Sequence, residues 1–159
     1  MFKLVQITPF SDLKYLKEIL ELFFIDKSLI FFNDFENVQN IFWKDLYSNS
    51  IIIASIDNNS VFGVVVLKRI EKISQDKFLC YLFGAAKRGY AKELTQALNY
   101  IFSDLKKHGF FAVRLETLSS NRAMRSMANR LGFRKVGEIK AAGMRKNKLL
   151  SSILYEKVL

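Results

Sequence analysis

Cysteine, histidine and proline each occur only once in the 159 residues. A single cysteine, Cys80, excludes an internal disulfide framework and a cysteine-rich metal site. A single histidine, His108, excludes a histidine-rich zinc site and disfavours a Ser-His-Asp triad. No Gly/Ser-rich tract, repeat or linker interrupts the chain. We therefore expect one domain over residues 1–159, with no bound metal.

Long apolar runs are absent as well. The longest ones, such as Ser60–Leu67, are far too short to cross a bilayer, and Met1–Leu4 lacks the features of a signal peptide. We expect a cytoplasmic protein without membrane contact. Half of the residues are hydrophobic and 15 are Phe, which excludes a disordered chain and predicts a folded core.

The charge is unevenly distributed along the chain. The formal net charge is +10. Residues 1–60 carry five basic and eight acidic side chains, whereas residues 61–159 carry twenty and seven. Such asymmetry favours an anionic partner for the second part: a polyphosphate cofactor, a nucleic acid or both. The alternative is a solvated basic surface with no specific partner.

Hydrophobic periodicity predicts the element order β-α-α-β-β-β-α-β-α-β-β. The predicted strands cover Phe2–Ile7, Ile51–Ile56, Val61–Ile70, Lys77–Phe83, Phe110–Thr117, Phe133–Ile139 and Leu149–Val158. The first predicted helix has Ser11 as N-cap and Leu13, Leu16, Leu20 and Phe23 as apolar positions, and the others begin at Asn33, Ala91 and Asn121. We expect an α/β fold with a mixed, largely antiparallel sheet of about seven strands and helices on both faces.

A loop of small and basic residues, Gly84–Gly89, follows one predicted strand and precedes a predicted helix. The first amides of a helix have no internal acceptor, and the helix dipole adds positive charge there. Gly89 would let the backbone approach an anion, and Lys87 and Arg88 add cations. The loop predicts a phosphate site, although an ordinary helix start near a glycine would look the same.

A second segment begins with Asn121, continues through a short predicted helix and ends in Leu131-Gly132-Phe133. The loop continues as Gly89-Tyr90-Ala91-Lys92-Glu93, similar to a common Gly-Tyr-Ala-x-Glu motif. Together the two segments resemble the GNAT superfamily of acyl-CoA N-acyltransferases. The motif agreement covers about residues 80–138, and the element order fits nearly the whole chain.

The resemblance implies acetyl-CoA, or another acyl-CoA, as co-substrate. It assigns the pyrophosphate to backbone amides of Lys87, Arg88, Gly89, Tyr90 and Ala91, the pantetheine arm to Leu82 and Phe83, and a further cofactor contact to Asn121. Two positions depart from the family's pattern. Ala86 stands where Arg or Gln is usual, and Ala128 stands where many members carry the Tyr that protonates the leaving thiolate.

Two residues are candidates for proton transfer. Glu116, near the end of a predicted strand, is the candidate base, and Tyr155, on the last strand, is a candidate proton donor. Their structural alternatives are a solvent-facing strand residue and a packed tyrosine. We interpret Cys80 as a small core residue and His108 as a helix C-terminal residue.

The resemblance predicts an N-acetyltransferase acting on a primary amine of a protein N-terminus, a lysine or a small molecule. The region expected to form the acceptor pocket contains acidic residues, which favour a cationic amine: Asp26, Asp34, Glu36 and Asp45. Phe31-Phe32 is hypothesised to line the entrance of this pocket. An amine linked to a nucleic acid remains an alternative acceptor, because the last part of the chain contains a late basic cluster: Arg134, Lys135, Lys140, Arg145, Lys146 and Lys148. A non-catalytic CoA-binding module and either a monomer or a homodimer also remain open.

Overall fold

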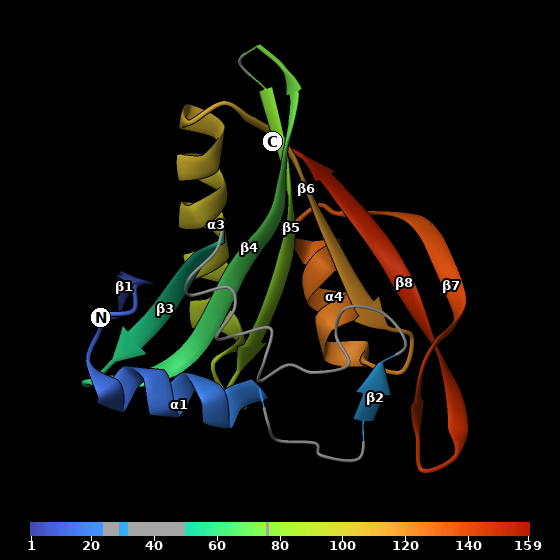
Figure 1. The fold of residues 1–159 in the computed structure, drawn as a ribbon, viewed down its shortest axis with the longest axis horizontal. Helices are drawn as coiled ribbons and strands as arrows, with labels where there is room; N and C mark the ends of the chain where they lie inside the picture. Colours follow the sequence, from blue (N-terminus) through green and yellow to red (C-terminus); the bar gives the residue numbers. More distant parts are fainter. Residues whose placement is uncertain (24–28, 32–49, 76) are drawn as a thin grey trace.

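The computed structural model describes residues 1–23, 29–31, 50–75 and 77–159. Figure 1 shows the elements of these parts of the chain in sequence order. They are β1 (Lys3–Ile7), α1 (Leu13–Phe23), β2 (Leu29–Phe31), β3 (Ile51–Asp57), β4 (Ser60–Ser74), β5 (Lys77–Ala86), α3 (Ala91–Lys107), β6 (Phe110–Leu118), α4 (Arg122–Arg130), β7 (Arg134–Arg145) and β8 (Lys148–Val158). The helix expected from Asn33 lies outside the described residues.

The strands form one sheet in the order β1-β3-β4-β5-β6-β8-β7-β2. Neighbouring strands are antiparallel except β5 and β6, which are parallel and joined by the crossover helix α3. The expectation of a mixed, largely antiparallel sheet is confirmed. The described residues contribute eight strands rather than about seven, because the short strand β2 pairs with β7 at an edge.

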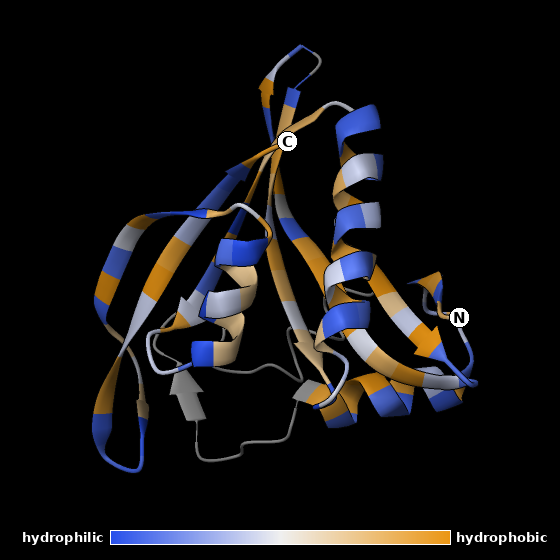
Figure 2. Ribbon diagram, turned by 180° about the vertical axis from the view of Figure 1, so that it is seen from behind, coloured by the Kyte–Doolittle hydropathy of each residue, from blue (hydrophilic) through white to orange (hydrophobic). Residues whose placement is uncertain are grey.

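Helices cover both faces of the sheet, as expected (Figures 1 and 2). Strand β4 shows why, because its side chains alternate between two cores. Val64 and Val66 belong to the core under α1, whereas Val65 and Leu67 belong to the core shared by α3 and α4. A strand buried on both faces reads as a continuous apolar run, which is what residues 61–67 show.

Helix α1 differs in detail from the prediction. Its N-cap is Asp12, whose Oδ1 accepts from the Lys14 N–H at 2.8 Å, while the Ser11 hydroxyl instead accepts from the Thr8 N–H at 2.9 Å. Leu13, expected on the apolar face, is 79% exposed. The buried face is Leu16, Ile19 and Leu22. The predicted face was therefore wrong by part of a turn, because several leucines and isoleucines fit more than one 3.6-residue stripe.

One predicted turn is confirmed, and two strand boundaries differ from the prediction. The hairpin between β3 and β4 turns at Asn58 and Asn59, with φ of 47° and 60°, which confirms the predicted turn. Strand β7 runs to Arg145, so most of the expected basic connection is strand. Strand β5 runs to Ala86, three residues beyond the prediction, which shortens the loop before α3 to residues 87–90.

Candidate functional site

Strands β5 and β6 run side by side and then separate. Their parallel pairing begins at Phe78 opposite Phe110 and ends at Leu82 opposite Leu115. Beyond that point β5 continues along β4 to Ala86, and β6 continues along β8 to Leu118. The sheet therefore opens between the carboxyl ends of the two strands, at the lower end of the view in Figure 1.

The last residues of β5 present backbone groups to this opening. The Lys87 N–H donates to the Phe62 carbonyl on β4 at 2.8 Å. Because successive residues of a strand direct their N–H and C=O groups to opposite sides, Gly84 and Ala86 direct theirs away from β4. A Cβ at Gly84 would lie 2.6 Å from the Val64 carbonyl oxygen, so only glycine fits at this close approach.

The loop after β5 leads into an uncapped helix start. Tyr90 is the N-cap of α3, but no side chain makes a capping hydrogen bond there. Gly89 has φ +93°, and a Cβ on it would meet nothing within 4 Å. The amides of Arg88, Gly89, Ala91, Lys92 and Glu93 donate to no acceptor among the described residues, and the first amide of α3 with a partner is that of Leu94, which donates to the Tyr90 carbonyl at 2.9 Å. This is a local arrangement that binds anions.

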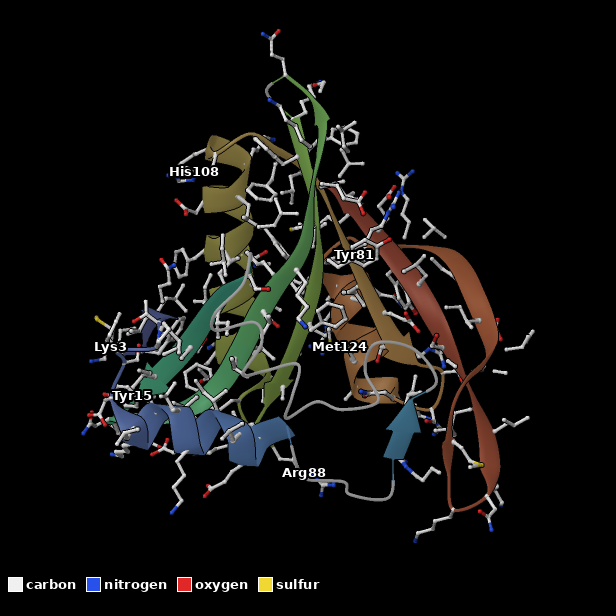
Figure 3. The ribbon with its side chains drawn as sticks, in the orientation of Figure 1. Lys3, Tyr15, Tyr81, Arg88, His108 and Met124 are labelled. Atoms are coloured by element: carbon white, nitrogen blue, oxygen red, sulfur yellow. The ribbon has the colours of Figure 1, made fainter. Side chains whose placement is uncertain are left out.

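The two cations of the loop have different surroundings. Lys87 Nζ donates to the Ser60 hydroxyl at 2.9 Å, and that hydroxyl donates to Glu18 Oε2 at 3.0 Å. The Val61 N–H donates to the same carboxylate oxygen at 2.6 Å. Lys87 is thus connected through Ser60 to α1 and to the start of β4. Arg88 is exposed, has no partner among the described residues and extends away from the ribbon in Figure 3.

Opposing effects act on the pKa of Glu18. Burial raises it, but the hydrogen bonds from the Val61 N–H and the Ser60 hydroxyl lower it, and so do the charges of Lys87 and Lys14. The net result is a pKa below the usual value, so the carboxylate is ionised at neutral pH and holds the loop from behind. On the other side, the Tyr90 ring stacks on Phe62 at a centroid distance of 4.7 Å.

The second helix start lies at the same end of the molecule. Strands β5 and β6 are parallel, and each leads into a helix packed in the same core, so the N-termini of α3 and α4 lie at one end. Asn121 is the N-cap of α4, and its Oδ1 accepts from the Met124 N–H at 3.1 Å. Its amide nitrogen has no partner among the described residues. Ala128 is fully buried in the core.

The two candidates for proton transfer lie on opposite faces of the sheet. Leu115 and Tyr155 are paired across β6 and β8, and both belong to the core under α3 and α4. Glu116, the first β6 residue beyond the last pair with β5, therefore faces the α1 side. The buried Ser152 hydroxyl donates to the Glu116 carboxylate. The structure does not bring Glu116 and Tyr155 to the same face.

Sequence reasoning missed a polar row beside Glu116. Tyr81, Arg114 and Glu156 are neighbours across β5, β6 and β8. Arg114 Nη1 donates to the Tyr81 hydroxyl at 3.4 Å and its Nε to Glu156 Oε2 at 2.7 Å, and both contacts raise the pKa of Arg114. Tyr81 is labelled in Figure 3. The available signal was the spacing of Arg114 and Glu116, two residues apart within an apolar strand.

Part of the late basic cluster is neutralised. Glu138 accepts from Lys140 at 2.8 Å and from Lys135 at 3.0 Å, and these contacts lower its pKa to about 2. Three other cations, Arg145, Lys146 and Lys148, lie at or beside the β7–β8 turn. The positive charge therefore does not form one uninterrupted surface. The acidic residues expected to favour a cationic amine, and Phe32, lie outside the described residues.

Cys80 and His108 lie away from this opening. Cys80 is fully buried, and burial raises the pKa of its thiol to about 12, which confirms a packing role. His108 is the C-cap of α3, with its ring nitrogen 2.9 Å from the Asp104 carbonyl oxygen. In the described parts of the chain, no helix is long and apolar enough to span a membrane, and no three His, Cys, Asp or Glu side chains are grouped to hold a metal.

No protein-family model and no curated protein matches the sequence, but solved structures match its fold. An N-acetyltransferase from Staphylococcus aureus superposes with a TM-score of 0.75 at 14% identity, covering 99% of this chain and 97% of that one. A GNAT-family acetyltransferase from Streptococcus pneumoniae gives 0.71 at 16% identity, covering 100% of both. The Microcin C7 self-immunity acetyltransferase, in complex with acetyl-CoA and AMP, gives 0.72 at 17% identity, covering 99% and 93%.

The molecule is a mixed α/β protein whose sheet opens between two parallel strands, with a helix beginning at the end of each. This is the fold of the GNAT acetyltransferases, and the fold class expected from the sequence is confirmed. At 14–17% identity the likeness concerns the fold.

Proposed function

We propose that this protein transfers an acetyl group from acetyl-CoA to a primary amine. The observation that carries the proposal is the opening between β5 and β6, with the uncapped N-terminus of α3 at its end. A neighbour with the same fold was solved with acetyl-CoA. The acceptor classes we propose are a protein N-terminus, a lysine side chain or a small amine.

The chain offers groups that fit a CoA molecule. The amides of Arg88, Gly89 and the first turn of α3 are the donors for the pyrophosphate, whereas the Lys87 amide is already used by Phe62. Peptide-like groups of pantetheine need backbone partners, and Gly84 and Ala86 direct such groups to the opening. We therefore propose that pantetheine binds to Gly84 and Ala86 rather than to Leu82 and Phe83.

Proton transfer is the chemical task of the side chains. A free alkylamine has a pKa of roughly 10.4, so its proton must be removed near pH 7 before it attacks the thioester carbon. Glu116 accepts this proton directly or through water, and Ser152 orients its carboxylate. A β5 N–H facing the opening stabilises the oxyanion that forms when the amine adds to the thioester carbon. This oxyanion then collapses to the amide carbonyl as the carbon–sulfur bond breaks and the CoA thiolate leaves. Tyr155, on the other face, is the candidate that returns a proton to the thiolate.

The position of Glu116 also indicates the direction of the acceptor. Its carboxylate lies on the α1 face, next to the row formed by Tyr81, Arg114 and Glu156. An amine that reaches Glu116 must therefore approach from the α1 face. Arg114 is paired with Glu156, so it adds no unbalanced positive charge that would repel a cationic amine.

The test joins a binding and a turnover measurement. Calorimetric titration with acetyl-CoA should give saturable binding, and thiol release with a panel of peptides, lysine and small amines should identify the acceptor class. Glu116→Gln should lower kcat by roughly 10²–10⁴-fold without changing acetyl-CoA affinity. Glu138→Gln is the matched control, since Glu138 lies on β7, which β8 separates from β6 and the opening. Tight binding without turnover on any amine would leave a CoA-binding module, and no binding would refute the proposal.

A further inference from the structure

Helix α4 carries a groove that the proposed chemistry does not use. The groove has a volume of about 430 Å³ and is lined by side chains of one helix face: Arg122, Arg125, Ser126, Asn129 and Arg130. This face is opposite to the one that α4 buries in the core with Met127 and Ala128. Figure 2 shows α4 beside α3 on the near side of the molecule, with strongly hydrophilic residues at both of its ends.

The groove is positively charged and has no acidic side chain in its lining. None of its three arginines forms an ion pair with the described residues. Arg125 Nη1 donates to the Ser119 carbonyl at 3.0 Å, and Arg130 Nε makes a long contact of 3.4 Å to the Ser126 carbonyl. Arg125 Nε is buried without a hydrogen-bond partner. Most of the guanidinium donors are therefore available to a ligand.

The placement of these arginines opposes the stability of α4 itself. Arg122 and Arg125 lie in or beside the first turn, where the helix dipole disfavours cations, and at the i,i+3 spacing they repel each other. Helix α3 shows the favourable arrangement, with Glu93 in its first turn and Lys106 and Lys107 in its last. An anion in the groove would remove both unfavourable effects on α4, and this is a reason for arginine at these positions.

We propose that this arginine groove binds the ribose 3′-phosphate of CoA, an inference that rests on the proposed function. A phosphate monoester carries about −1.5 to −2 charges at pH 7 and matches the forked donors of arginine. The proposed pyrophosphate site lies at the N-terminus of α3, at the same end of the molecule as the N-terminus of α4. The two helices pack in one core, and in CoA only the ribose separates the pyrophosphate from the 3′-phosphate.

The test compares CoA with dephospho-CoA, which lacks only this phosphate. The wild-type protein should bind CoA at least about tenfold more tightly than dephospho-CoA by calorimetry. In the variant Arg122→Gln/Arg130→Gln this ratio should fall close to one, with dephospho-CoA affinity nearly unchanged. The control Lys106→Gln/Lys107→Gln removes the same charge at the far end of α3 and should keep the wild-type ratio.

Several results would overturn the inference. Equal binding of the two cofactors by the wild-type protein would refute it while leaving the proposed function intact. An unchanged ratio in the arginine variant would place the 3′-phosphate elsewhere. Salt-dependent binding of tRNA that is lost in this variant, with an unchanged cofactor ratio, would assign the groove to a nucleic acid. If the wild-type protein bound neither cofactor, the proposed function would fail as well.

Discussion

Helices α3 and α4 begin at the same end of the sheet but differ in whether a side chain caps their first backbone amides. Helix α3 has no side-chain cap, an open glycine before it and an acidic residue in its first turn. Helix α4 has a side-chain cap from Asn121 and arginines in its first turn. The backbone supplies the positive potential at α3, whereas side chains supply it at α4.

This difference predicts what each site tolerates. A backbone site depends on close approach and on φ, so it should respond to added bulk and negative charge at Gly89. A side-chain site depends on the number of cations and should respond to the loss of arginine. Variants of the two helix starts can therefore be separated by what they impair, which is affinity for CoA and dephospho-CoA alike at α3 and the preference for CoA over dephospho-CoA at α4.

The largest effect on CoA affinity is expected from Gly89→Glu. Its side chain would place a carboxylate where the phosphates are proposed to bind, so CoA affinity should fall by more than about 100-fold, equivalent to about 2.7 kcal/mol. Calorimetric titration measures this loss. Gly89→Asn is the matched control, because asparagine accepts positive φ and a Cβ here meets nothing within 4 Å. Unchanged CoA affinity in Gly89→Glu would disprove the phosphate assignment of the loop.

Glu18 supports the α3 site from behind, and Glu18→Ala should lower the free energy of unfolding by about 1–2 kcal/mol at pH 7. The pKa of Glu18 is lowered in the folded protein, so its contribution is present above the ordinary pKa and is lost as pH falls below about 4.5. Urea unfolding at several pH values measures this difference. Glu21→Ala, an exposed site on the same helix, should show no such dependence. A difference that grows at low pH would contradict this account.

At α4 the cap can be separated from a ligand contact. Asn121→Ala should lower stability by about 1 kcal/mol, because the Met124 amide loses its acceptor, whereas Asn121→Ser keeps a capping oxygen. If the free amide nitrogen of Asn121 also contacts the cofactor, Asn121→Ser should retain stability and lose CoA affinity by a few-fold. Thermal unfolding and calorimetry measure the two effects. If Asn121→Ser bound CoA with wild-type affinity, Asn121 would act as a helix cap alone and would not contact the cofactor.

The sequence predicted both helix starts but not the relation between strands. The loop before Ala91 and the segment from Asn121 could be found because helix starts depend on local residues. Glu116 and Tyr155 could not be placed on opposite faces, because that requires the pairing of Leu115 with Tyr155 across β6 and β8. A shift of one residue in this register would exchange the faces, and no local pattern determines it.

The smallest effects should come from the two loop cations, and they should differ in kind. Arg88 is exposed without a described partner, so Arg88→Gln should leave stability unchanged and weaken CoA binding several-fold, more at low salt than at high salt. Lys87 is bonded to Ser60 near Glu18, so Lys87→Gln should lower stability by about 0.5–1 kcal/mol and affect CoA affinity less. Urea unfolding and calorimetry at two salt concentrations compare the variants. The opposite assignment, with Lys87 dominating affinity, would mean that its ammonium leaves Ser60 when CoA binds.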